Sequence, residues 1–107
     1  MPLTRDFKVT IQGRIKRDPA FRRALLREGI ESLLAGDVQT GKIVLRDFVN
    51  ATVGFTKLGR ATHHSPKSLM RMLGPKGNPS AKNLFEIVAY LQRQERVRLK
   101  VSSSAAA

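Results

Sequence analysis

The sequence contains no cysteine and no long apolar run. The missing thiols exclude disulfides and thiolate-bound metals. Apolar stretches are only a few residues long, whereas a membrane-spanning helix needs about 20. The amino-terminal residues lack the continuous apolar stretch that follows the basic residue of a signal peptide. These absences predict a cytoplasmic protein with no membrane partner.

Acidic residues are few and unevenly placed. Eight stand against 20 lysines and arginines, which gives a net charge of +12. Residues 48–85 contain no acid and six basic residues, so these 38 residues carry +6, whereas residues 18–47 carry five of each sign. A carboxylate facing a phosphate would repel it, so an acid-free basic segment is typical of nucleic-acid binding.

Groups that carry catalysis or hold metals are also scarce. The only histidines are the adjacent pair His63 and His64, with no cysteine or paired carboxylate nearby. Metal ligation and a Ser-His-Asp or Cys-His site are therefore not predicted. The glycine-containing loop at 74–78 lacks the GK[ST] ending of a Walker-type phosphate loop. We expect neither enzymatic activity nor a cofactor.

The 107 residues form one domain by the usual length rule. Apolar and polar residues alternate at 7–11 and 97–101, which predicts two short strands that pair with each other or across a dimer. Residues 1–17 are then a basic strand or arm, and residues 96–101 a carboxy-terminal strand. The final segment, 102–107, consists of serine and alanine and is expected to be a disordered tail.

Residues 18–95 have the periodicity of five helices. Each of four helix starts has a capping side chain, namely Asp18, Asp37, Ser65 and Ser80. Helix 55–62, a turn at 63–65 and helix 66–73 together predict a helix-turn-helix at 55–73. Gly59 falls where the two helices would approach closely, so a small residue is needed there.

The second helix of this motif is short enough to enter a DNA major groove. Its outward side chains are the expected base contacts: Lys67, Ser68, Met70 and Arg71. Arg71 is the first choice, because a guanidinium donates two parallel hydrogen bonds to a guanine edge. Expected phosphate contacts lie at helix starts and in the following loop: Thr56, Lys57, Arg60, Ser65, Lys76, Asn78 and Lys82.

The segment FTKLGRATHHSPKSLMRMLGPKGNPSAKNLFEIVAYL resembles the Xre-type, phage-repressor-like helix-turn-helix of addiction-module antidote proteins. These are antitoxins encoded beside toxins of the RelE, ParE or HigB kind, and the resemblance covers roughly residues 37–92. It implies a dimer that binds an operator, represses its own operon and neutralises a toxin. Phe55 and His63 depart from the glutamine and glycine usual at those positions, and Thr62 and His64 replace apolar residues.

The predicted fold class is mainly α: a compact five-helix, repressor-like bundle with a helix-turn-helix and short terminal β-strands. Two other functions stay open. One is a stand-alone regulator without a toxin, and the other is a nucleic-acid binder of low specificity, which could bind RNA. RNA binding normally uses exposed aromatics, and the five phenylalanines mostly fall on expected inward faces. A toxin would meet the basic segment 5–17 or the neutral helix 19–35, where the nearby acids are Glu28, Glu31 and Asp37.

Overall fold

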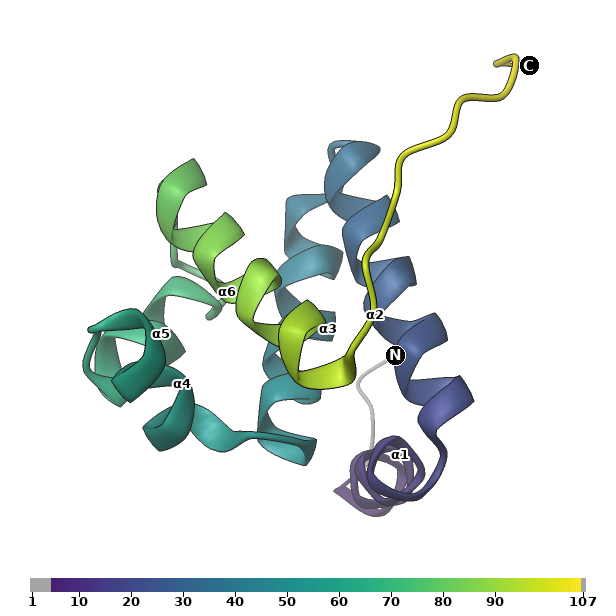
Figure 1. The fold of residues 1–107 in the computed structure, drawn as a ribbon. Coiled ribbons are helices and arrows are strands. Elements are labelled where there is room, and N and C mark those ends of the chain that lie inside the picture. Colours follow the sequence, from purple (N-terminus) through teal and green to yellow (C-terminus); the bar gives the residue numbers. More distant parts are fainter. Residues whose placement is uncertain (1–4, 107) are drawn as a thin grey trace.

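The computed structural model describes the backbone of residues 5–106 and the side chains of residues 9–106. The described chain contains six helices (Figure 1): α1 (Arg5–Arg17), α2 (Pro19–Leu34), α3 (Val38–Ala51), α4 (Gly54–Thr62), α5 (Pro66–Met72) and α6 (Ala81–Glu95). Expectations for residues 1–4 and 107 lie outside the described chain. Among the described residues, no helix has the length and apolarity needed to cross a membrane.

The predicted fold class of five helices with terminal strands is wrong, because residues 5–106 contain six helices and no strand. The expected strand at 7–11 belongs to α1. A strand would place Val9 and Ile11 on one face, but Val9 is 62% exposed while Ile11 packs against the core. The apolar residues that reach the core are four positions apart, as in a helix: Ile11 and the fully buried Ile15 share one helix face.

The carboxy-terminal segment 97–101 is also not a strand, although its alternation is real. Val97 and Leu99 pack against the core, and Arg98 and Lys100 are exposed. The Leu99 amide donates to the Gln92 side-chain carbonyl at 2.8 Å. A strand needs a neighbouring strand for its remaining backbone groups, and the segment expected to supply one is helical. Residues 102–106 continue without regular secondary structure and are exposed.

The four predicted helix caps are confirmed. In each case the capping side chain accepts a hydrogen bond from the amide three residues later, at 3.1–3.2 Å, for Asp18, Asp37, Ser65 and Ser80. Hydrogen bonds from Thr40 also hold the pKa of Asp37 below its usual value. These bonds satisfy amides that a helix start otherwise leaves unpaired, so the helix starts follow from local sequence.

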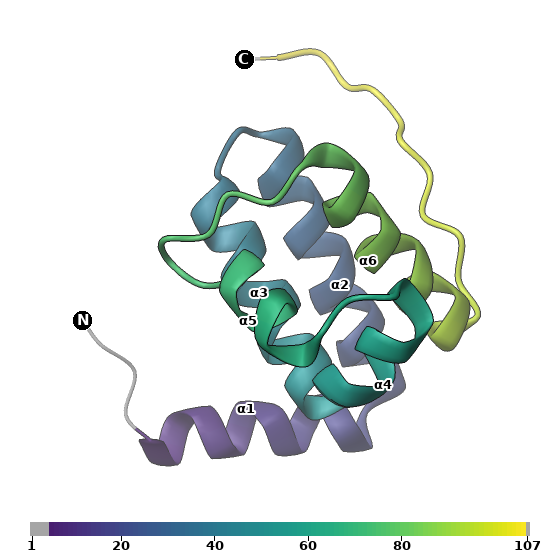
Figure 2. The same ribbon diagram turned by 90° about the vertical axis from the view of Figure 1, so that its left-hand side faces the viewer.

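The helices surround one core. α2 and α3 form a long antiparallel pair, and α1 crosses one end of it (Figures 1 and 2). α4 packs against α3, α5 and α6, so α4 joins the amino-terminal helices to the rest. The core residues at these junctions include Leu26, Leu45, Phe48, Leu58, Leu69, Ile87 and Leu91. The pair α4–α5 therefore packs on one side against the core. It faces the viewer in Figure 2.

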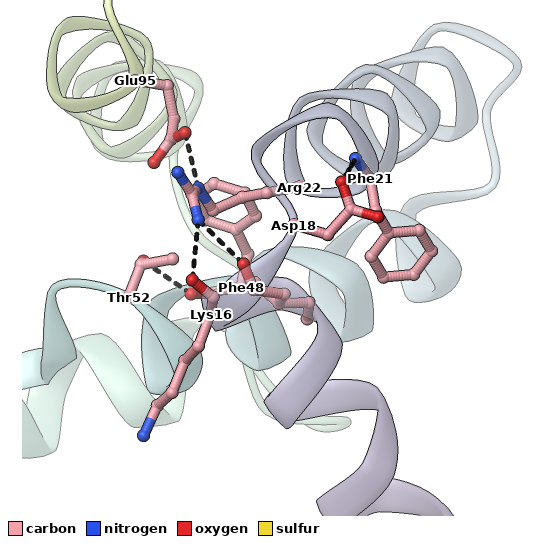
Figure 3. A network of polar contacts seen from close by, with 8 residues as sticks. Lys16, Asp18, Phe21, Arg22, Phe48, Thr52 and Glu95 are labelled. Carbon is pink, nitrogen blue, oxygen red and sulfur yellow. Dashed lines mark hydrogen bonds and ion pairs between the residues drawn. The ribbon is translucent and has the colours of Figure 1, made fainter.

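A largely buried ion pair links three helices where α1 ends (Figure 3). Arg22 of α2 donates to the Glu95 carboxylate of α6 at 2.6 Å. The same guanidinium donates to the backbone carbonyls of Ile15 and Lys16 at 2.9 and 3.2 Å, which closes the end of α1. One side chain thus connects α1, α2 and α6, and its loss would leave a buried carboxylate without its partner.

We predict that Arg22→Met lowers the free energy of unfolding by about 3–5 kcal/mol, because the Glu95 carboxylate stays buried and unpaired. Urea denaturation followed by circular dichroism measures this change. Arg27→Met is the matched control: Arg27 and Glu31 are exposed and 3.9 Å apart, so its effect should stay within about 0.5 kcal/mol. Equal effects of the two substitutions would contradict the structural role of Arg22.

Candidate nucleic-acid interface

The helix-turn-helix is built around a close approach of backbone to Gly59. A Cβ at Gly59 would lie 2.5 Å from the carbonyl oxygen of His64, and the His64 amide donates back to the Gly59 carbonyl at 3.1 Å. His63 ends α4 in the left-handed region, at φ 59°. This is the backbone conformation that glycine adopts most readily. The turn therefore keeps its geometry although His63 replaces the glycine that is usual at this position. The requirement for a small residue at Gly59 is confirmed.

Helix α5 has a clear inner and outer side. Leu69 and, just after the helix, Leu73 are buried, whereas the expected base contacts Lys67, Met70 and Arg71 are exposed. Ser68 is half-buried, and its hydroxyl lies 2.9 Å from the hydroxyl of the capping Ser65. Three of the four side chains expected to contact bases therefore face solvent freely, and the fourth shares its hydroxyl with the helix cap.

The expected phosphate contacts are all exposed, but they come from different elements. Thr56, Lys57 and Arg60 lie on α4, Ser65 precedes α5, and Lys82 lies in the first turn of α6. Lys76 and Asn78 belong to the loop that joins α5 to α6. Their exposure leaves every one of these side chains accessible to a large ligand.

A hollow of about 280 Å³ brings four of the expected contact residues together. We call it the basic hollow; it is lined by Ser68, Arg71, Met72, Lys76, Gly77 and Asn78. Two cations and two neutral polar side chains thus surround one surface depression between α5 and the following loop. This lining suits an anionic oxygen group. The remaining expected contacts do not line this hollow: Thr56, Lys57, Arg60, Ser65, Lys67, Met70 and Lys82.

The loop beside the basic hollow is held by side chains of α3, a contact that is not among the sequence-based expectations. Lys42 is 1% exposed, and its ammonium donates to the carbonyls of Gly74 and Gly77 at 3.0 and 2.7 Å. Gln39, one turn earlier, donates to the Pro75 carbonyl at 3.3 Å. The sequence does contain a pattern that could have indicated a buried lysine. Lys42 lies between Val38 and Leu45 at helical spacing, on a face otherwise predicted to be apolar.

A second hollow, of about 420 Å³, lies between α2, α6 and the carboxy-terminal segment. We call it the apolar hollow, because its lining includes the large exposed side chains Leu34 (65%), Phe85 (59%) and Val101 (79%). Phe85 is thus an exception to the expectation that the phenylalanines mostly fall on inward faces, whereas Phe48 and Phe55 are buried as expected. One side of α6 meets the core through Ile87 and Leu91, and Phe85 falls on a different side. Glu31 and Arg27 also line this hollow.

Within residues 9–106 no group of three or more histidine, aspartate or glutamate side chains is placed to hold a metal ion. His64 lies 3.8 Å from Glu86 of α6 and is therefore directed toward a carboxylate rather than outward. His63 is exposed at the turn. The two adjacent histidines thus serve the turn in different ways, one through its backbone conformation and one through its side chain.

Comparison with known proteins adds no relative. No protein-family model matches this chain, and searches of curated proteins and of solved structures give no match. The similarity to addiction-module antidotes therefore depends on the residues quoted above and enters the function as a proposal.

We predict that Gly59→Ala lowers the free energy of unfolding by about 1–3 kcal/mol, because its methyl group would overlap the His64 carbonyl. Thermal unfolding measures the change. Gly13→Ala is the matched control: its Cβ would meet only the flexible end of Arg17, at 3.2 Å. That substitution should stabilise the protein by about 0.5–1 kcal/mol through helix propensity. A stable Gly59→Ala protein would contradict the close packing of the turn.

Proposed function

We propose that this protein is a cytoplasmic, non-enzymatic DNA-binding repressor that recognises a specific operator as a homodimer. The observation that carries the proposal is the surface of α4, α5 and the 74–78 loop. Its exposed side chains come from the acid-free segment 48–85, which carries +6. A short exposed helix in a basic segment that itself contributes no carboxylate fits a DNA major groove and its flanking phosphates.

The outer side of α5 supplies two kinds of contact in this proposal. Lys67, Met70 and Arg71 are exposed along a helix of seven residues and would reach base edges. Lys76 and Asn78 stand at the basic hollow and would bind a phosphate of the backbone. Base contacts distinguish sequences, whereas phosphate contacts set position and affinity on any DNA. The two groups therefore make different predictions.

We predict that Arg71→Ala weakens binding to the cognate operator by about 1–3 kcal/mol and leaves binding to scrambled duplex nearly unchanged. Fluorescence anisotropy with both duplexes, the cognate one taken from the protein's own promoter, measures the two affinities. An equal loss on both duplexes would show that Arg71 contacts phosphate, and the base-reading role would be withdrawn.

Lys76→Ala serves as the matched phosphate variant. It should weaken binding to both duplexes alike and reduce the slope of log affinity against log salt by about one unit. Binding of the wild-type protein that scrambled duplex and salt abolish would contradict a repressor and favour the low-specificity nucleic-acid binder. The exposed Phe85 does not support RNA stacking at this surface, since it lines the apolar hollow instead.

The second part of the proposal is a protein partner, a toxin neutralised by this protein as an antidote. The apolar hollow supports it, because Leu34, Phe85 and Val101 leave a large apolar depression on the surface. The neutral helix α2 borders this hollow and exposes Glu28 and Glu31. The cations Arg27, Arg98 and Lys100 also line the hollow, so its apolar area rather than its charge is what would attract a protein partner.

We predict that the product of the neighbouring reading frame copurifies with this protein and that Phe85→Glu abolishes the complex, because it places a charge in an apolar contact. Coexpression followed by size-exclusion chromatography measures complex formation. Ile43→Glu is the matched control, since Ile43 is an exposed apolar side chain of α3 and lies outside the hollow. Failure of wild-type protein to copurify would leave a stand-alone regulator.

A further inference from the structure

Lys42 is a charged side chain in the interior with no carboxylate partner in the described part of the chain. It is 1% exposed and occurs in none of the ion pairs among residues 9–106. Its only hydrogen-bond acceptors there are the carbonyls of Gly74 and Gly77. A buried ammonium is costly unless its donors are paired. The lysine therefore requires the loop in its observed conformation.

The loop in turn has little freedom beside α5. A Cβ at Gly77 would lie 2.1 Å from the Arg71 carbonyl and 2.4 Å from the Met72 carbonyl, so the loop folds directly over the end of α5. The Gly77 amide donates to the Gly74 carbonyl at 3.0 Å, which closes a turn around Pro75 and Lys76. Lys42 binds the carbonyls at both ends of this same turn.

The bonds from Lys42 to the loop also affect the residues that line the basic hollow. Lys76 lies inside the turn whose two end carbonyls Lys42 binds, and Asn78 directly follows this turn. Gln39 adds a bond from α3 to the Pro75 carbonyl. Two side chains one turn apart on α3 therefore hold the segment that carries Lys76 and Asn78 beside Arg71. The order of this segment should be established before any ligand arrives.

We propose that Lys42 is a positioning residue for the DNA interface, whose buried ammonium fixes the 74–78 loop so that Lys76 and Asn78 stand ready beside Arg71. The part that concerns DNA rests on the proposed function above. The part that concerns the loop does not, since it follows from the free protein alone. The two parts can be tested separately.

The first experiment uses the free protein and measures hydrogen exchange at the Gly77 amide by NMR. Lys42→Met keeps an unbranched apolar side chain, one heavy atom shorter than lysine, and removes the ammonium. We expect exchange to become about 10- to 100-fold faster, because two hydrogen bonds from a charged donor are lost. Lys100→Met, which removes one exposed charge outside the motif, should leave the rate unchanged. An unchanged rate in a folded Lys42→Met protein would overturn the proposal.

The second experiment measures whether Lys42 acts through Lys76. Affinity for scrambled duplex, and its salt slope, are compared for Lys42→Met, Lys76→Ala and the double variant. If Lys42 positions Lys76, then Lys76→Ala has little further effect once Lys42 is replaced, and Lys42→Met lowers the salt slope by about one unit. If the double variant loses as much affinity as the product of the two single losses, the positioning role is overturned. A merely structural effect would lower the melting temperature and leave the slope intact.

Gly77→Ala keeps the experiment decisive if Lys42→Met fails to fold. Its methyl group must displace the loop while the ammonium stays in place, and we expect the same loss of salt slope with Lys100→Met again unchanged. A normal salt slope in Gly77→Ala would overturn the proposal. If the wild-type protein binds neither duplex, the DNA function is overturned, and the exchange at Gly77 still decides whether Lys42 fixes the loop.

Discussion

A helix of seven residues cannot hold its own position, and α5 is that short. Its placement depends on what secures its two ends. At the start, the Ser65 cap and the approach of the chain to Gly59 set the angle between α4 and α5. At the end, the chain folds back over α5, and Lys42 holds that fold from α3. The placement of α5 is therefore set at both ends by contacts with neighbours outside the helix.

Charge is arranged so that this surface and the rest of the protein differ. The acid-free segment 48–85 supplies α4, α5 and the loop, while the neutral segment 18–47 supplies most of α2 and α3. The pair of Arg22 and Glu95 is largely buried, whereas the pairs Arg14–Asp18 and Arg27–Glu31 are exposed. A basic surface and a second surface with a large apolar area thus occupy different parts of one small fold. This separation is what the proposed pairing of DNA and a protein partner requires.

The helix-turn-helix could be predicted from local pattern, and two of its details show why. Ser65 followed by Pro66 begins a helix by a bond that spans three residues, and Gly59 occupies the one position where a side chain would overlap the turn. The basic hollow could be predicted only in part. Lys76 and Asn78 are among the expected contact residues, but nothing local indicates that Arg71 and Ser68 share a depression with them. That depends on how the loop folds back.

What the sequence determined by itself is therefore the set of interactions that act within a few residues: the four caps, the turn and the uneven charge. The tertiary structure alone decided whether an alternating segment becomes a strand or a helix, since residues 7–11 lack a strand partner and bury Ile11 and Ile15 instead. It also decided that Lys42 points inward and Phe85 outward. Burial depends on which face meets a neighbour, and that neighbour lies far away in the sequence.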